Sequence, residues 1–309
     1  MDSTGLWDSC LVGSVAGKHV RIEAWRWTMQ AAMAYVDRFQ FRVGETPLSE
    51  WKAPAIACLV YVGTVMGTKV AMRKVSKKPM AKDGPLRFLN VLHNFFLSFS
   101  SIILLGLIAY ELMKIYTTAG GGFHGFFRVY CDPKPHQNVS GKLVFYYYLN
   151  YLLKYYELLD TMILVLAGKK TAFLHVYHHA ATLTLCWSQL YTLSTVQWVP
   201  ITLNLMVHFF MYYYYGMASL GRQVWWKKYL TTGQIVQFVV DVFACSLSLA
   251  LRHNAEANMN WFPGNTWCGG DYWGAYFGIG LLFSYLVLFV QFFIATYLRS
   301  TVSSKRKRA

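Results

Sequence analysis

The sequence predicts an all-α membrane protein of seven transmembrane helices, and three observations carry this prediction. Hydrophobic residues make up 55% of the 309 residues and charged residues only 14%, a balance that is unusual for a soluble domain of this size. The apolar residues are gathered into seven runs of about 20 residues, the length that a helix needs to cross a bilayer. Basic residues are concentrated in alternate loops between these runs, as expected of a chain that crosses the membrane repeatedly.

The seven predicted spans are, in chain order, residues 53–71, 90–112, 143–167, 172–193, 197–219, 231–251 and 272–298. A lumenal N-terminal segment, residues 1–50, precedes them and includes a candidate amphipathic helix at residues 25–41. The membrane domain occupies residues 51–299, and a cytosolic basic tail occupies residues 300–309. We therefore expect a single membrane domain.

The formal net charge of +15 follows the predicted topology. Because the positive-inside rule counts cations, the loops after the first, third and fifth spans and the C-terminal tail are expected in the cytosol. A nucleic-acid-binding surface would need a soluble scaffold, which the composition excludes. Five cations also precede the first span and leave an even number of spans open: Lys18, Arg21, Arg26, Arg38 and Arg42.

The loops on the opposite side carry features of an oxidising lumen. Cys131, in the loop before the third span, and Cys268, before the seventh, are expected to form a disulfide. The loop of Cys131 also contains Asn138 in an Asn-Val-Ser triplet, an acceptor for N-glycosylation that has meaning only in the lumen. Both features favour the same side of the membrane.

The third span contains ionisable residues, which are costly in lipid and therefore indicate a special role. Within KYYELLDT they lie at intervals of three, three and one: Lys154, Glu157, Asp160 and Thr161. This spacing places most of them on one helical face. A buried ion pair that fixes helix packing and a catalytic role explain the pattern equally well.

The fourth span gives the strongest chemical signal. His175, His178 and His179 lie at positions i, i+3 and i+4 of HVYHH, so the three imidazoles project to one side of a helix. A single histidine among apolar residues is usually a hydrogen-bonded core residue. Three at this spacing indicate a shared task.

The fifth and sixth spans each add a polar face. In the fifth, the face consists of Asn204, His208, Met211, Tyr212 and Tyr215. In the sixth, it consists of Thr231, Gln234, Gln237 and Asp241, for which interhelical hydrogen bonding is as good an explanation as substrate contact. Four consecutive polar faces cannot all be exposed to lipid, so we expect them to converge on an internal cavity.

Four segments, KYYELLDT, HVYHH, NLMVHFFMYYYY and TTGQIVQ, resemble in order and spacing the motifs KxxExxDT, HxxHH, NxxxHxxMYxYY and TxxQxxQ of the ELO family of fatty-acid elongases. The match runs from about Leu143 to Asp241, and the Leu92-His93-Asn94 patch of the second span looks shared as well. The segment from Cys186 to Tyr215 looks more like the fungal-type branch, which acts on saturated and monounsaturated chains.

The resemblance implies an enzyme of the endoplasmic reticulum whose seven helices enclose an acyl tunnel. Such an enzyme joins malonyl-CoA to a long-chain acyl-CoA, releases carbon dioxide and CoA, and yields a 3-oxoacyl-CoA. It uses no cofactor or metal, depends on reductase and dehydratase partners of the elongation cycle, and is compatible with self-association. The end of the tail, Lys305 to Ala309, looks like a KxKxx retrieval signal, although a basic membrane anchor explains it equally well.

We expect the catalytic residues to be His175, His178, His179, Asn204 and His208. Their expected supports are Lys154, Glu157, Asp160, Thr161, Tyr212, Gln234 and Gln237, and the cations expected to bind CoA are Lys169, Lys170, Arg222, Lys227 and Lys228. In one mechanism His178, with His208 as partner, forms an acyl-imidazole and gives ping-pong kinetics. In the other the histidines act only as acid, base and oxyanion donors. Cys186 is a weaker nucleophile candidate, because buried cysteines are usually inert.

Two other classes of protein share part of this sequence pattern. Membrane di-iron desaturases and hydroxylases also carry HxxHH boxes, but they use more ligands than the five histidines within these spans, and the iron content of the purified protein separates the classes. A lipid transporter would also place polar groups at membrane depth. It predicts uptake without turnover.

Overall fold

The computed structural model describes residues 29–75, 84–132, 140–168, 172–259 and 267–298, and within these residues the protein is all-α. Its long helices are α2 (Lys52–Val75), α3 (Pro85–Thr118), α5 (Lys142–Leu166), α6 (Phe173–Tyr191), α7 (Trp198–Ser219), α8 (Lys227–Glu256) and α9 (Tyr272–Phe293). Each predicted span corresponds to one of them, and α3 and α8 extend beyond the expected range at both ends. The short elements are α4 (Gly122–Cys131), the 3-10 turn η1 (Thr195–Gln197) and the π-helical turn η2 (Ile294–Leu298).

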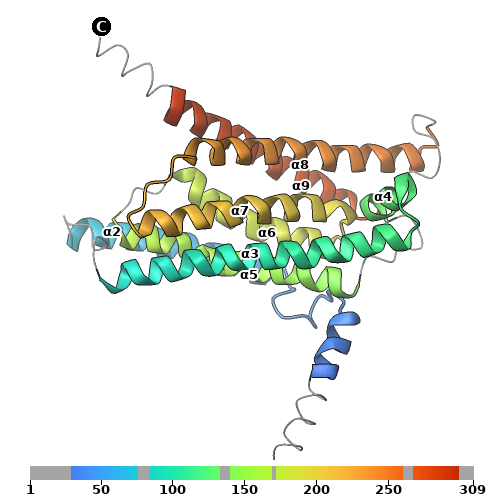
Figure 1. Ribbon diagram of the computed structural model, residues 1–309, viewed down its shortest axis with the longest axis horizontal. Coiled ribbons are helices and arrows are strands. Elements are labelled where there is room, and N and C mark those ends of the chain that lie inside the picture. The colour runs from blue at the N-terminus through green and yellow to red at the C-terminus, as the bar shows by residue number, and fades with distance from the viewer. Residues whose placement is uncertain (1–28, 76–83, 133–139, 169–171, 260–266, 299–309) are drawn as a thin grey trace, which may run out of the picture.

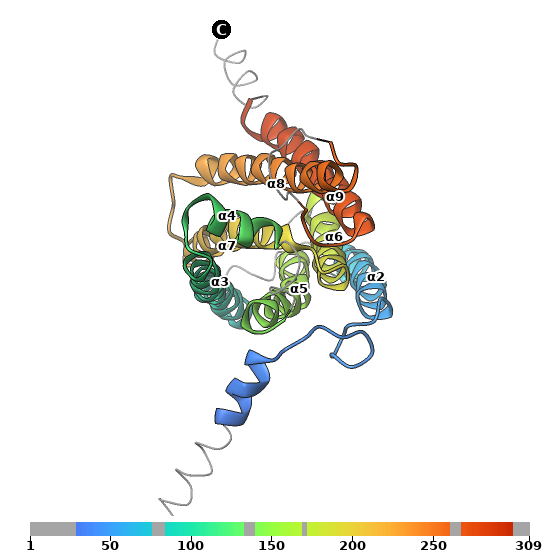
Figure 2. The ribbon, with the colours of Figure 1, turned by 90° about the vertical axis from the view of Figure 1, so that its right-hand side faces the viewer.

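Six of the long helices form a closed ring, seen end-on in Figure 2. Around the ring, α3 packs on α7, α7 on α8, α8 on α9, α9 on α6, α6 on α5, and α5 again on α3. Helix α2 lies outside the ring against α5 and α6. The four helices that carry the polar motifs, α5 to α8, are all members of the ring, so a shared interior is available to them.

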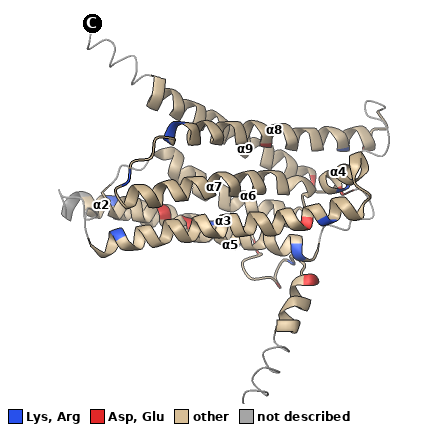
Figure 3. Ribbon diagram, viewed as in Figure 1, with Lys and Arg blue, Asp and Glu red and all other residues tan. Residues whose placement is uncertain are grey.

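The connections between the helices lie at the two ends of the bundle. Helices α2, α5, α7 and α9 finish at one end, which we call the basic end, and α4 lies at the other, which we call the disulfide end (Figure 1). Figure 3 shows lysine and arginine on the α7–α8 connection and at the first turn of α3, both at the basic end. These are the positions that the positive-inside rule assigns to the cytosol.

Four helical stretches within the described residues are long and apolar enough to cross a bilayer: Lys52–Met72, Pro85–Thr118, Lys227–Glu256 and Tyr272–Leu298. The other long helices, α5, α6 and α7, carry most of the charged and polar motif residues, which lowers their hydropathy. Large apolar side chains such as Leu59, Phe99 and Phe243 are 61–75% exposed on the outer surface, as expected where lipid replaces water. The chain is a multi-pass membrane protein, and seven crossings stays a prediction.

The segment before α2 docks on the disulfide end of α5 and α6. Phe39 is 3% exposed and stacks on Tyr148, with ring centroids 5.3 Å apart. Tyr151 donates to the carbonyl of Leu48, and the Trp187 indole donates to the carbonyl of Ser49 at 2.7 Å. Residues 29–37 are helical, within the predicted amphipathic range, and project away from the ring (Figure 1).

Candidate active site

A closed circuit of four polar side chains joins α5 to α7 inside the ring. Lys154 Nζ donates to Glu157 Oε1 at 2.8 Å and to Asn204 Oδ1 at 2.9 Å. His208 completes the circuit: its Nε2 is 3.1 Å from Asn204 Nδ2, and its Nδ1 is 3.3 Å from Glu157 Oε1, an ion-pair distance outside hydrogen-bond geometry. Lys154, Glu157 and His208 are at most 4% exposed. The ion pair that the α5 motif allowed is therefore present, and it reaches the histidine of α7.

The partners in this circuit determine the orientation of two groups. An ammonium group only donates, so the Asn204 atom that faces Lys154 is the carbonyl oxygen, and the amide NH₂ faces His208. Because an NH₂ group also only donates, His208 Nε2 accepts, and the proton of the neutral imidazole is on Nδ1, on the side of Glu157. His208 thus has no free lone pair and holds the Asn204 amide in position.

Asp160 is the centre of a second polar group, which links α5 to α3, α6 and α7. Its Oδ1 contacts His93 Nε2, and its Oδ2 accepts a hydrogen bond of 2.6 Å from the Tyr212 hydroxyl. His179 Nε2 lies 3.6 Å from the same Oδ2. The last histidine of the HVYHH motif therefore faces a carboxyl group that is itself held by side chains of α3 and α7.

Thr161 belongs to a different contact from its neighbour Asp160. Its hydroxyl is 2.5 Å from the hydroxyl of Tyr61 on α2, and its side chain is fully buried. This contact ties α5 to the helix outside the ring. Thr161 therefore supports the packing of the site and does not line the cavities described below.

The three histidines of α6 lie in its first two turns, close to the basic end. The ring centroids of His175 and His179 are 4.6 Å apart, and those of His178 and His179 are 5.7 Å apart. His178 also faces an aromatic ring of α9, Tyr285, at 4.9 Å. Two imidazole atoms, His175 Nε2 and His178 Nδ1, are buried without a hydrogen-bond partner among the described residues. Buried polar atoms normally have a partner, so each of these two nitrogens has a hydrogen-bonding capacity that the described residues do not use.

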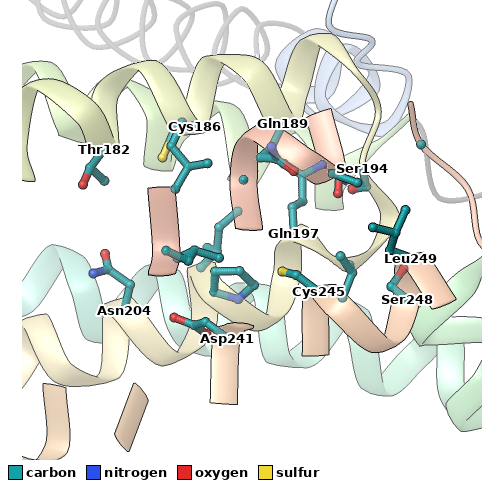
Figure 4. A pocket seen from close by; sticks show the side chains of 18 of the residues that line it. Thr182, Cys186, Gln189, Ser194, Gln197, Asn204, Asp241, Cys245, Ser248 and Leu249 are labelled. Carbon is teal, nitrogen blue, oxygen red and sulfur yellow. Dashed lines mark hydrogen bonds between the residues drawn. The ribbon is translucent and has the colours of Figure 1, made fainter. Parts of the chain in front are cut away.

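Two cavities meet at this site. The basic-end cavity is lined by residues that include His175, His179, Met211, Lys227 and Gln234. The disulfide-end cavity is lined by residues that include Lys154, Cys186, Asp241, Ser248 and Arg252. Both are lined by His178, Asn204, Gln237 and Phe238. Figure 4 shows the disulfide-end cavity, with Thr182 and Cys186 of α6 across from Asp241 and Cys245 of α8.

The two glutamines of α8 line the interior, Gln237 at this junction and Gln234 on its basic-end side. Gln234 Nε2 is 3.6 Å from the sulfur of Met211 in the basic-end cavity. Gln237 Nε2 donates to Asp241 Oδ2 at 3.2 Å, and Gln237 lines both cavities. Their spacing on the helix therefore brings both of them to the interior, as the sequence predicts.

Of the cations expected to bind CoA, Lys227 lines the basic-end cavity. Lys228 lies 5.9 Å from the ring centroid of Phe293, and Arg222 is in the exposed α7–α8 connection. Lys169 and Lys170 lie outside the described residues, between Gly168 at the end of α5 and Ala172, which lines the same cavity. Asn138 and the C-terminal basic tail also lie outside them.

Cys131 and Cys268 form a disulfide in the structure, the pairing that the sequence predicts. It joins the last residue of α4 to the segment before α9 across 137 residues of sequence. The amide of Gly269 also donates to the Cys131 carbonyl at 2.9 Å. Cys268 lines the disulfide-end cavity, so this bond supports its far end.

The motifs did not identify two residues that the structure brings to the site. His93 of α3 contacts Asp160, and the signals for it were its presence as a histidine within an apolar span and the family resemblance of the Leu92-His93-Asn94 patch. Tyr285 of α9 packs against His178 in a helix without any motif, so the sequence carried no signal for it.

The described residues include no group of three histidine, cysteine or acidic side chains placed to hold a metal ion. The di-iron alternative therefore gains no ligand set from the described part of the chain.

The chain that carries this site matches a family of known proteins. Residues 46–305 match the family described as ELO: GNS1/SUR4 family. The chain belongs to the ELO family. A putative fatty acid elongase 1 of Schizosaccharomyces pombe is 39% identical to this ELO chain over 271 residues, which are 88% of this chain and 77% of the relative.

More distant relatives of the ELO chain carry the same kind of name. Fatty acid elongase A of Dictyostelium discoideum is 35% identical over 272 residues, 88% of this chain and 92% of the relative. Very long chain fatty acid elongase 5 of Rattus norvegicus is 30% identical over 219 residues, 66% of this chain and 65% of the relative. The family resemblance expected from the four motifs is therefore confirmed, and the ELO chain fits a condensing role in fatty-acid elongation.

Proposed function

We propose that this protein is a very-long-chain 3-oxoacyl-CoA synthase of the endoplasmic reticulum membrane, with its C-terminus in the cytosol. It joins malonyl-CoA to a long-chain acyl-CoA and releases carbon dioxide and CoA. One observation carries the proposal: His178 has a ring nitrogen without a partner among the described residues, and it lies at the junction of a cavity lined by Lys227 and a second, deeper cavity. A substrate with an anionic head and a long apolar tail fits this arrangement.

The orientation of the substrate follows from charge. The CoA phosphates cannot enter the bilayer, so they stay at the basic end, near Lys227 and the connections that contain Lys169, Lys170 and Arg222. The acyl chain then extends past the histidines into the disulfide-end cavity. This places the thioester carbonyl at the junction, next to His178.

The free nitrogen of His178 supports the ping-pong mechanism. In the first step His178 Nδ1 attacks the thioester carbonyl, an acyl-imidazole forms, and CoA leaves as the thiolate and takes up the imidazole proton. In the second step malonyl-CoA loses carbon dioxide, and the resulting enolate carbon attacks the acyl carbonyl and displaces the imidazole. The product is the 3-oxoacyl-CoA, and the displaced imidazolate of His178 returns to its neutral form by taking up one proton from water, which is the proton that the overall reaction consumes.

The circuit around Lys154 has a positioning role in this proposal. Lys154 and His208 fix the Asn204 amide, which lines both cavities, and Lys154 adds a positive charge beside the acyl carbonyl. Preorganised donors of this kind stabilise the oxyanion of a tetrahedral intermediate. His208 therefore acts through Asn204, because its own Nε2 lone pair is already used.

The decisive experiment omits malonyl-CoA. Purified protein is incubated with labelled long-chain acyl-CoA, and free CoA and protein-bound acyl groups are measured by mass spectrometry. We expect about one CoA released per protein and an acyl group on His178. Full condensation activity without CoA release in the absence of malonyl-CoA would support the sequential mechanism instead, and absence of condensation would refute the proposed function. The same assay with a panel of acyl-CoAs tests our expectation that saturated and monounsaturated chains are used in preference to polyunsaturated ones.

A further inference from the structure

The wall of the disulfide-end cavity contains two buried acceptor atoms that the proposed reaction does not use. Asp241 is fully buried, its Oδ2 accepts from Gln237, and its Oδ1 has no hydrogen-bond partner among the described residues. Asn150 is 1% exposed, its Nδ2 donates weakly to the Cys186 sulfur at 3.6 Å, and its Oδ1 likewise lacks a partner in the described part of the chain. Both residues line the same cavity.

The two residues lie at the same depth beyond the reaction centre. Asn150 precedes Lys154 by one turn of α5, which runs toward the basic end, and Asp241 follows Gln237 by one turn of α8, which runs away from it. Lys154 is bonded to Asn204, and both Asn204 and Gln237 line the junction of the cavities. Each acceptor therefore lies one helical turn, about 6 Å along the axis of its own helix, beyond a residue that is at or next to the junction, which is on the order of five methylenes of an extended chain.

Methylene groups cannot satisfy these atoms. A saturated acyl chain would leave both acceptors buried and unpartnered, which opposes binding. Gln237 donates to Asp241 Oδ2, so any proton on the carboxyl group is on Oδ1, and Oδ1 either accepts or donates according to its protonation state. A hydroxyl group fits both states because it can donate and accept. A keto group only accepts, so it fits only the protonated carboxyl group, and a double bond fits neither state.

We propose that the disulfide-end cavity is a binding site for long-chain acyl groups with a hydroxyl in the middle of the chain, and that Asp241, with Asn150 opposite, recognises this hydroxyl. The inference rests on the proposed function for the identity of the acyl-CoA and adds the substrate class. Figure 4 shows Asp241, Cys245 and Ser248 in succession along one wall, so the chain passes Asp241 on its way into the cavity. The selectivity therefore depends on the position of the hydroxyl along the chain.

The test measures binding separately from turnover. Purified full-length protein is incubated with a labelled unsubstituted long-chain acyl-CoA, and unlabelled acyl-CoAs of equal length compete, with the hydroxyl moved one carbon at a time. We expect the isomers with the hydroxyl near the depth of Asp241 to compete about tenfold better than isomers with it near the thioester or the methyl end. Binding without condensation would refute the proposed function, and the isomer profile would still decide this inference.

Three variants make the test specific. Asp241→Leu is expected to weaken binding of the favoured isomers about tenfold and to strengthen binding of the unsubstituted chain, because it replaces an acceptor by an apolar group. Asp241→Asn turns its amide oxygen toward the Gln237 donor and places its NH₂ where Oδ1 was. This NH₂ can still donate to a hydroxyl oxygen, so the variant should retain most of the preference. Thr232→Val, on the exposed face of the same helix, is the control and should keep the wild-type isomer profile.

Two results would overturn the inference. In one, the hydroxyl weakens binding equally at every position in the wild-type protein, which means that a buried water serves these oxygens. In the other, Asp241→Leu folds and keeps the wild-type isomer profile. If Asp241→Leu does not fold, Asn150→Leu takes its place, with the same expected loss of preference and the same contradictory outcome.

Discussion

Lys154 and Glu157 are buried together, and each depends on the other. Lys154 donates to Glu157 and Asn204, so its removal leaves a buried carboxylate and an amide oxygen without their partner. We predict that Lys154→Met lowers the free energy of unfolding by about 3–5 kcal/mol, the usual effect of breaking a buried ion pair. The double variant Lys154→Met/Glu157→Gln removes both charges and should recover part of that loss. Thermal unfolding in detergent measures both, and equal destabilisation by the single and double variants would contradict the prediction.

Substitutions of His178 and of His208 are expected to affect activity and stability differently. Because His178 Nδ1 has no hydrogen-bond partner in the described structure, His178→Ala should remove condensation by at least about 10³-fold with little change in melting temperature. His208→Ala also removes the partner of the Asn204 amide, so it should lose activity and stability together. Activity with malonyl-CoA and melting temperature are measured for both. Normal turnover by either variant would contradict their assigned roles.

At the scale of elements, the disulfide between α4 and the segment before α9 restrains the far end of the disulfide-end cavity, which Cys268 lines. The bond closes a segment of 137 residues, for which the chain-entropy model gives a stabilisation of about 4–5 kcal/mol. We predict that Cys131→Ala/Cys268→Ala has a lower melting temperature than the wild type, and that the two cysteines resist alkylation in freshly isolated protein. Cys58→Ala, which removes a free cysteine, is the matched control. Mass spectrometry that finds both thiols free would end the prediction.

Helix pairing also explains how buried polar groups of α3 and α7 are satisfied. The Ser98 hydroxyl donates to the Phe209 carbonyl at 3.0 Å, and the Asn90 amide donates to the Ser219 hydroxyl at 2.8 Å. Interhelical hydrogen bonds of this kind take the place of hydrophobic association where lipid is the solvent. They hold α3 and α7 together on one side of the ring, next to Asp160.

At the scale of the whole molecule, charge separates the two ends of the bundle. If the basic end binds the CoA phosphates, Lys169→Gln/Lys170→Gln should raise the KM for acyl-CoA several-fold while kcat stays within about twofold, because phosphate contacts are made equally in the ground and transition states. Lys52→Gln/Lys114→Gln removes the same charge at exposed positions elsewhere and should keep the wild-type KM. Unchanged KM in the first variant, with its orientation in the membrane preserved, would show that these lysines only set topology.

The sequence by itself determined the local features of this protein. The apolar runs correspond to the observed long helices, and a period of 3.6 residues decides which side chains of a helix lie on one face. The polar faces predicted in this way include His178, Asn204 and Gln237, which line the same cavity. The motifs also indicated the family, since residue type and spacing are local properties of the sequence.

Only the tertiary structure decided which faces meet. The contact of His93 with Asp160 joins residues that are 67 positions apart in the sequence. The hydrogen bond from Asn204 to His208 depends on Lys154, which approaches Asn204 from another helix. The unpartnered oxygen of Asp241 is likewise visible only once the cavity wall is assembled. Helical periodicity specifies a face but not its partner, because in a lipid-embedded ring the partner is selected by side-chain packing and by the need to satisfy every buried polar group.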